Sequence, residues 1–86
     1  MSTPINVNPV NVSPVILKPV NVNFGKRLRE LRHKQGWTQL YMSVHVGIDR
    51  SYISEMENGK QAVCLPVLKD LSDAFGISMS EILSGL

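Results

Sequence analysis

The sequence predicts an all-α domain of five short helices over residues 24–86, preceded by an extended N-terminal arm over residues 1–23. After residue 24 the apolar side chains recur at helical spacing, and a glycine follows most apolar stretches where a helix would end. The same region shows no alternation of apolar and polar residues, which would indicate strands. A domain this short needs a compact helical core or association with another chain to be stable.

The first predicted helix begins at Phe24. Leu28 and Leu31 follow at helical spacing with charged residues between them, which gives the helix one apolar face. Gly36 is well placed to end this helix, because glycine adopts the left-handed conformation without steric cost. The first helix therefore lies between Phe24 and Gly36.

The second and third predicted helices cover residues 39–46 and 50–57. Thr38 offers an N-cap hydroxyl for the second helix, and Gly47 closes it. Asp49 caps the third helix, which ends at the Asn58-Gly59 pair. Two short helices with a three-residue connection follow from these caps.

The fourth predicted helix covers residues 66–75, with Pro66 in the first turn, where proline is tolerated. Gly76 stops it. Ser78 or Ser80 then caps a short last helix within residues 81–86. Apolar residues of both helices are expected to complete the core: Leu68, Leu71, Phe75, Ile82 and Leu83.

The connection between the second and third helices is too short for an antiparallel hairpin, so these helices must cross steeply, as in a helix-turn-helix. Such a crossing needs a small residue where the helices approach, and Ser43 is there. It also needs a residue that tolerates positive φ in the turn, and Gly47 is there. Three apolar residues then follow in register to face inward: Ile48, Ile53 and Met56.

The charges are unevenly distributed along the chain. Residues 24–60 contain seven Lys and Arg against four Asp and Glu, whereas residues 61–86 contain one basic residue against three acidic ones. The chain therefore has a cationic half suited to a polyanion and a mildly anionic half suited to a remote side.

These features resemble the phage-repressor/Cro-type (Xre-like) helix-turn-helix transcriptional regulators. The similar segments are GKRLRELRHKQGWTQ, HVGIDRSYISEMENGK and LSDAFGIS, and the resemblance spans about residues 24–84. It implies a five-helix phage-repressor-like DNA-binding domain whose third helix enters the major groove of double-stranded DNA. It also implies a homodimer on a palindromic operator, acting as a repressor or autoregulator.

The same resemblance implies roles for individual residues. The residues facing base edges would be Arg50, Ser51, Glu55 and Tyr52. The residues holding the DNA backbone would be Thr38, Gln39, Asn58 and Lys60. Structural roles would fall to Ser43 and Gly47 at the turn and to Arg32 and Glu57, where the family commonly pairs an arginine with a glutamate.

Simpler explanations exist for two of these sets. Arg50 and Glu55 would suit an ordinary solvated helix face, but their place in the helix-turn-helix spacing favours DNA contact. Glu55 repels phosphate, so it must accept from a cytosine amino group, orient Arg50, or act against non-specific DNA. The Arg32–Glu57 pair is either an exposed bridge of little energetic value or, as we expect, a partly buried tie that positions the third helix.

Trp37 is expected to pack between helices rather than to stack on a base.

Neither catalysis nor a cofactor is expected. No serine, histidine and carboxylate set lies in a recognisable motif, and no glycine-rich phosphate loop is present. His33, His45 and Cys64 are too scattered for a zinc site. There is no apolar run of membrane-spanning length and no secretory signal, and a single cysteine suits a reducing compartment. We therefore expect no membrane partner and a cytoplasmic, nucleoid-associated protein.

The arm has a proline at every fifth residue from Pro4 to Pro19. Because side chains along a strand alternate with period two, this period excludes one flat amphipathic strand. Lys18 is the only basic residue of the arm, so a phosphate-grasping arm is not predicted. The arm is either a disordered tether or, as we favour, a set of short extended pieces that pack on a neighbouring subunit or another protein.

Two functions from different classes follow. The first is a sequence-specific DNA-binding transcriptional regulator, favoured by Gln39, Arg50, Asn58 and Lys60. The alternative is an antitoxin-like or anti-repressor module that keeps the fold and docks a protein partner through its arm. For the homodimer, the predicted contact is a C-terminal apolar surface assisted by the arm: Phe75, Ile77, Met79, Ile82, Leu83 and Leu86, with Val10, Val12, Val15, Leu17, Val20 and Val22.

Overall fold

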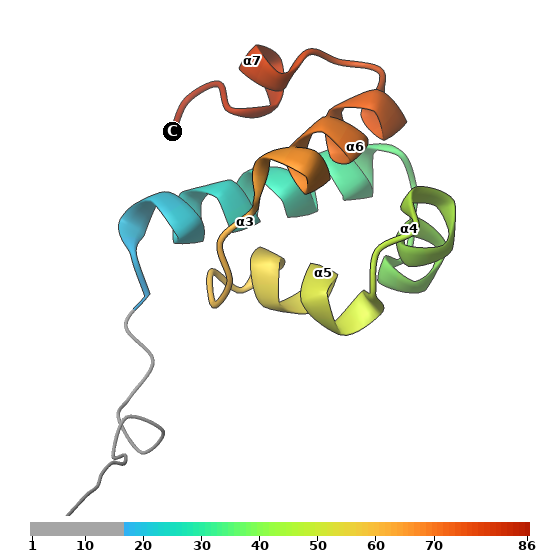
Figure 1. Cartoon of the computed structure of the whole chain (residues 1–86), viewed down its shortest axis with the longest axis horizontal. Coiled ribbons are helices and arrows are strands. Elements are labelled where there is room, and N and C mark those ends of the chain that lie inside the picture. Colours follow the sequence, from blue (N-terminus) through green and yellow to red (C-terminus); the bar gives the residue numbers. More distant parts are fainter. Residues whose placement is uncertain (1–16) are drawn as a thin grey trace, which may run out of the picture.

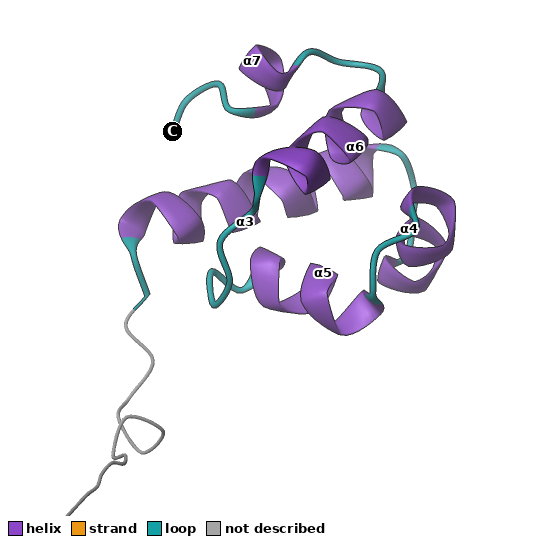
Figure 2. Ribbon diagram, viewed as in Figure 1, coloured by secondary structure: helices purple, strands orange, loops and turns teal. Residues whose placement is uncertain are grey.

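The computed structural model describes residues 17–86, which form five α-helices (Figure 1). No strand occurs among these residues (Figure 2). The all-α class predicted from the sequence is confirmed. In chain order the helices are α3 (Pro19–Lys34), α4 (Gln39–Val46), α5 (Arg50–Glu57), α6 (Leu65–Phe75) and α7 (Met79–Ile82).

Helices α4 and α5 begin and end where the sequence predicted. The Thr38 hydroxyl accepts a hydrogen bond from the Tyr41 N–H at 2.9 Å, and Asp49 Oδ2 accepts from the Ser51 N–H at 3.2 Å. Each cap satisfies a backbone donor that the first turn of a helix leaves unpaired. Gly47 ends α4 in the left-handed conformation, with φ 81°.

The two C-terminal helices are positioned by a proline and a capping box. Pro66 lies in the first turn of α6, as predicted, and Gly76 ends the helix with φ 69°. Ser78, rather than Ser80, caps α7, because the Ser78 hydroxyl and the Glu81 carboxylate each accept from the other's backbone N–H. As a result α7 begins earlier than the predicted stretch and ends at Ile82.

Helix α3 begins at Pro19, five residues before the predicted start at Phe24. Residues 19–23, assigned from the sequence to the extended arm, are therefore helical. Proline is favoured at the start of a helix because its missing N–H would have no partner there, and its ring fixes a helical φ. The proline that suggested an extended piece thus begins a helix.

The first turn of α3 packs on the turn that follows α5. A Cβ added at Gly59 would lie 2.8 Å from Val22 Cγ2 and 2.9 Å from Val22 Cα, so the two backbones are in close contact. The extended conformation predicted for Val20 and Val22 as part of the arm is wrong, since both residues are helical. The remaining arm residues that were assigned to the dimer contact, except Leu17, lie outside the described part of the chain.

A single apolar core connects all five helices. Helix α5 crosses α3 so closely that a Cβ at Gly25 would lie 2.4 Å from the Met56 carbonyl oxygen. Figure 1 shows α5 and α7 on opposite sides of α3. None of the helices within residues 17–86 is both long and apolar enough to cross a membrane. The buried apolar residues are Phe24, Leu28, Leu31, Met42, Ile53, Met56, Leu68, Leu71, Phe75 and Ile82.

Trp37 packs between helices, as predicted. Its ring stacks on Phe75 with centroids 5.3 Å apart, and it also meets Tyr41 and His45 of α4 at 5.6 Å and 5.0 Å. Aromatic contacts at these separations stabilise packing beyond the area that they bury. Trp37 therefore joins the segment between α3 and α4 to the end of α6.

Candidate nucleic-acid interface

The sharp turn between α4 and α5 is organised by Ser43. Its carbonyl oxygen accepts hydrogen bonds from the N–H groups of Gly47 and Ile48, at 2.9 Å and 3.1 Å. Its hydroxyl donates to the Leu40 carbonyl oxygen at 2.7 Å. The serine is small enough for the close approach and satisfies its own polar group, so α4 and α5 meet in a helix-turn-helix.

Helix α5 turns one face inward and the opposite face to solvent. Ile53 and Met56 are fully buried. Residues two positions away on a helix lie about 200° around its axis, which places Ser51 and Glu55 on the outer face. Both are exposed, as is Arg50 in the first turn of α5. The structure therefore brings together three of the four side chains predicted to face bases.

Two of those four side chains are engaged within the protein. The Ser51 hydroxyl hydrogen-bonds to the Asp49 carboxylate, and this bond lowers the pKa of Asp49. Tyr52 is half-buried, which raises the pKa of its hydroxyl, and that hydroxyl donates to the Ala62 carbonyl oxygen at 2.8 Å. Tyr52 thus ties α5 to the following loop.

Arg32 and Glu57, which were expected to form a partly buried tie, form a deeply buried ion pair. Arg32 Nε and Nη2 donate to Glu57 Oε2 and Oε1 at 2.7 Å and 2.9 Å, in a two-pronged contact. The Glu57 side chain is 0% exposed and that of Arg32 is 10% exposed. Arg32 Nη1 also donates to the Trp37 carbonyl oxygen at 2.8 Å. The pair fixes the C-terminal end of α5 against α3.

Both partners of this ion pair are held in their charged forms. Burial alone would raise the pKa of Glu57, but hydrogen bonds from Arg32 and Gln39, the charge of Arg32 and a bond from Arg29 outweigh it, so the pKa is lowered. The hydrogen bond to Glu57 raises the pKa of Arg32 although burial on its own would lower it. The carboxylate is therefore ionised at neutral pH.

Two residues predicted to hold the DNA backbone are connected to the same carboxylate. Gln39 Nε2 donates to Glu57 Oε1 at 3.1 Å. Asn58 Oδ1 accepts from Arg29 Nη2 at 3.1 Å, while Arg29 Nε lies 3.4 Å from Glu57 Oε1. Arg29 was not predicted from the sequence to belong to this cluster, although its position three residues before Arg32 places both on one face of α3.

The other two predicted backbone contacts lie at the edges of this cluster. Thr38 is exposed, and its hydroxyl is engaged in capping α4. Lys60 is exposed just beyond α5, and its N–H donates to the Glu55 carbonyl oxygen at 2.8 Å. Donor groups thus lie at the start of α4 and beyond the end of α5.

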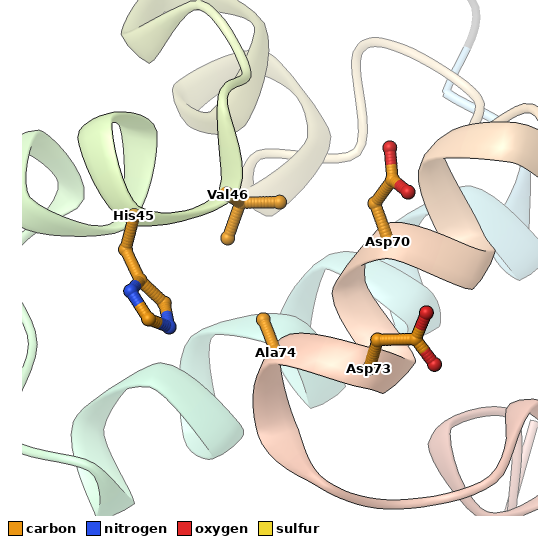
Figure 3. A pocket seen from close by; sticks show the side chains of 5 residues that line it. All are labelled: His45, Val46, Asp70, Asp73 and Ala74. Carbon is orange, nitrogen blue, oxygen red and sulfur yellow. The ribbon is translucent and has the colours of Figure 1, made fainter.

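A shallow hollow of about 330 Å³ lies between α4 and α6, lined by His45, Val46, Asp70, Asp73 and Ala74 (Figure 3). The two carboxylates come from α6; Asp73 is paired with Lys69 at 2.7 Å, while Asp70 adds a negative charge that would repel phosphate. Within residues 17–86, no group of three or more His, Cys, Asp and Glu side chains is arranged to hold a metal ion. This hollow therefore does not extend the surface around α5 that was predicted to face DNA.

Comparison with known proteins agrees with this geometry. The chain is 35% identical over 68 residues to the control protein C.MunI of a Mycoplasma species, covering 78% of this chain and 92% of that protein. The structure of the restriction-modification controller protein C.AhdI from Aeromonas hydrophila is similar with a TM-score of 0.69 at 39% identity, covering 72% of this chain and 94% of that one.

A third similar structure is the clp gene regulator ClgR from Corynebacterium glutamicum, with a TM-score of 0.70 at 26% identity, covering 77% of this chain and 86% of that one. Residues 28–82 match the helix-turn-helix family, which is most of the chain. This chain belongs to the helix-turn-helix family of DNA-binding transcriptional regulators, which are not enzymes.

Proposed function

We propose that this protein is a sequence-specific regulator that binds a palindromic operator as a homodimer, inserts α5 into the major groove and represses transcription, including that of its own gene. Such a protein would act in the cytoplasm, at the nucleoid. The observation that supports this proposal most directly is the exposed face of α5. This face exposes Arg50 and Glu55 to solvent, while the buried Arg32–Glu57 pair holds the C-terminal end of α5 against α3.

The exposed face of α5 has the chemistry needed to distinguish base pairs. Arg50 carries a planar fork of donors that matches the O6 and N7 acceptors of guanine. Glu55 accepts hydrogen bonds and suits a cytosine amino group. Within residues 17–86 neither side chain forms a hydrogen bond or ion pair to another side chain. Both are therefore available to a base pair.

The donor groups around α5 would set its register on the duplex. Gln39 and Asn58 offer side-chain amides, and Lys60 offers a charged ammonium. Phosphate contacts of this kind position a protein on DNA without reading sequence. A single helix-turn-helix reads few base pairs, so specificity requires two copies on successive major grooves, roughly 34–36 Å apart.

The similar proteins support a role in gene control. Two of them, C.MunI and C.AhdI, are described as a control protein and a restriction-modification controller protein. We propose a regulator of the same kind here.

Selection of binding sites from a pool of random duplexes tests the proposal, followed by gel-shift titration of the selected duplex over a series of salt concentrations. The expected site is an inverted repeat with half-site centres about one helical turn apart. Affinity for it should exceed that for random duplex by about a thousandfold or more. Failure to enrich any sequence would overturn the proposal. Enrichment of a single unrepeated half-site would overturn the dimeric part of it.

A further inference from the structure

Arg29 is the residue of α3 that connects the buried ion pair to the surface. Its side chain is 44% exposed, whereas that of Glu57 is fully buried. Its Nε contacts the Glu57 carboxylate at 3.4 Å, and its Nη2 donates to Asn58 Oδ1 at 3.1 Å. A guanidinium can do both because its donors are held in a rigid plane. Arg29 therefore joins the acid that anchors α5 to an amide exposed at the end of the same helix.

The contact with Arg29 determines which way the Asn58 amide points. An arginine has no acceptor, so only the oxygen of the amide can face it. The NH2 group of Asn58 is then directed away from Arg29, and a phosphate oxygen needs a donor of this kind. Gln39 is oriented in a similar way: one N–H of its amide donates to Glu57, and the second N–H remains available as a donor.

Arg29 also changes the net charge of the cluster. Arg32 and Glu57 neutralise each other within hydrogen-bond distance. The guanidinium of Arg29 adds one positive charge that the buried carboxylate does not balance, and it lies beside the exposed amide. Without Arg29 the cluster would have no net charge to attract a phosphate.

We propose that Arg29 is a positioning residue for DNA binding: it orients the Asn58 amide as a phosphate donor and supplies the unbalanced positive charge of the cluster. The inference rests on the proposed binding of duplex DNA by this face. It assigns Arg29 a role that is separate from the structural tie, which Arg32 and Glu57 form.

Affinity for short random-sequence duplex, measured over a salt series, tests this, since phosphate contacts do not depend on sequence. Arg29→Ala should reduce affinity more than tenfold and lower the slope of log affinity against log salt by about 0.9. Asn58→Ala should reduce affinity about tenfold and leave the slope nearly unchanged. Arg29→Lys keeps the charge but loses the planar fork, so it should keep the slope and reduce affinity about fivefold.

The double variant Arg29→Lys with Asn58→Ala separates orientation from charge. It should bind no more weakly than Asn58→Ala alone, because there is no longer an amide to orient. Lys26→Ala is the matched control: Lys26 is an exposed basic residue of α3 beside the C-terminal Ser84–Leu86 segment, so its loss should leave the slope unchanged. Thermal unfolding of each variant checks that the fold is intact.

The possible failures are distinguishable. If the unmodified protein binds no duplex at any salt concentration, the proposed function is wrong and this inference falls with it. If the protein binds but Arg29→Ala leaves the slope unchanged, Arg29 does not supply the charge. Full additivity of Arg29→Lys and Asn58→Ala would show that Arg29 does not orient the amide.

Discussion

Glu57 receives hydrogen bonds from residues of two different helices besides its own. Arg29 and Arg32 donate from α3, and Gln39 donates from the first turn of α4. A fully buried carboxylate is stable only when its oxygens are paired and its charge is balanced. The Glu57 side chain therefore holds α5 in a fixed position against both α3 and α4.

Arg32 and Glu57 should be energetically coupled. Replacing either one with alanine leaves a buried charge without its partner and should lower the free energy of unfolding by about 3–5 kcal/mol. The double alanine variant should lose clearly less than the sum of the two losses. Urea unfolding of the unmodified protein, the two single variants and the double variant gives the coupling energy. Strict additivity would show that the pair does not act as a unit.

The lowered pKa of Glu57 predicts a pH-dependent stability. The folded state binds the Glu57 proton less tightly than the unfolded state, whose carboxyl has the ordinary pKa of 4.5. The contribution of ionised Glu57 to the free energy of unfolding is therefore fully present above about pH 4.5. It is lost as the pH falls through the lower pKa of the folded state. Urea unfolding of the protein and of Glu57→Gln should show a stability difference that shrinks with acidification. A difference independent of pH would contradict the assignment.

Arg50 is expected to read a base rather than a phosphate. Arg50→Ala should weaken binding to the selected operator by roughly 1–3 kcal/mol and relax the preference at one base pair in each half-site. Binding to random duplex should change much less. Gel-shift titration on both probes measures this. Equal losses on the two probes would make Arg50 a phosphate contact.

At the scale of whole helices, the caps could be predicted because their chemistry is local. Thr38 and Asp49 accept hydrogen bonds from residues two or three positions away, and Gly47 needs only its own backbone freedom. The start of α3 was missed although Pro19 is itself a local helix-start signal, because the regular spacing of the prolines suggested an extended arm. The packing of Val22 against Gly59, which supports this first turn, is distant in the sequence and could not be predicted.

In the candidate site, too, the features set by local sequence could be predicted and those set by long-range packing could not. The spacing of the two short helices and their tight turn was enough to predict that Arg50, Ser51 and Glu55 lie outward. It was not enough for Tyr52, which is half-buried and bonded to the Ala62 carbonyl oxygen. The hydrogen bonds of Arg29 could not be predicted, since they depend on how closely α3 approaches the end of α5. Gly25 allows that approach, and its significance appears only once both helices are placed.

A comparison of two glycines tests the packing of α3 on the turn after α5. Gly36 and Gly59 have nearly the same φ, 73° and 74°, but only Gly59 would bring its added Cβ against Val22. Gly36→Ala should cost about 1 kcal/mol from backbone strain alone. Gly59→Ala should cost about 3 kcal/mol, because the clash with Val22 adds to the strain. Equal losses in urea unfolding would show that the first turn of α3 is not docked there.

At the scale of the whole molecule, fewer apolar side chains are available for a dimer contact than the sequence predicted. Phe75 and Ile82 were predicted to lie in a C-terminal contact, but both are buried in the core of the protomer itself. Ile77 and Met79 are half-buried against that core. Leu83 and Leu86 remain well exposed, at 39% and 42%. These two leucines are the apolar side chains that a partner subunit could cover at this end.

The placement of α7 keeps that surface away from the proposed DNA-binding face. Helices α5 and α7 lie on opposite sides of α3 (Figure 1), and Arg27 Nη2 fastens the end of α7 by donating to the Glu81 carbonyl oxygen at 3.0 Å. A contact through Leu83 would therefore leave both copies of α5 exposed. Such an arrangement is required if two copies bind successive major grooves.

Dimer formation is tested by sedimentation of two variants. Leu83→Glu places a charge on the proposed contact and should convert the proposed dimer to monomer, because an interface disfavours a buried unpaired charge. Removal of residues 1–17 should weaken the proposed dimer while leaving the helices of residues 19–86 intact, since Lys18 at the N-cap of α3 is retained. The cut belongs before Lys18 because a later one would remove the N-cap residue or helical residues of α3. If the truncated chain dimerises as tightly as the full chain, the arm does not contact the partner subunit. If Leu83→Glu remains dimeric, the contact lies elsewhere on the surface.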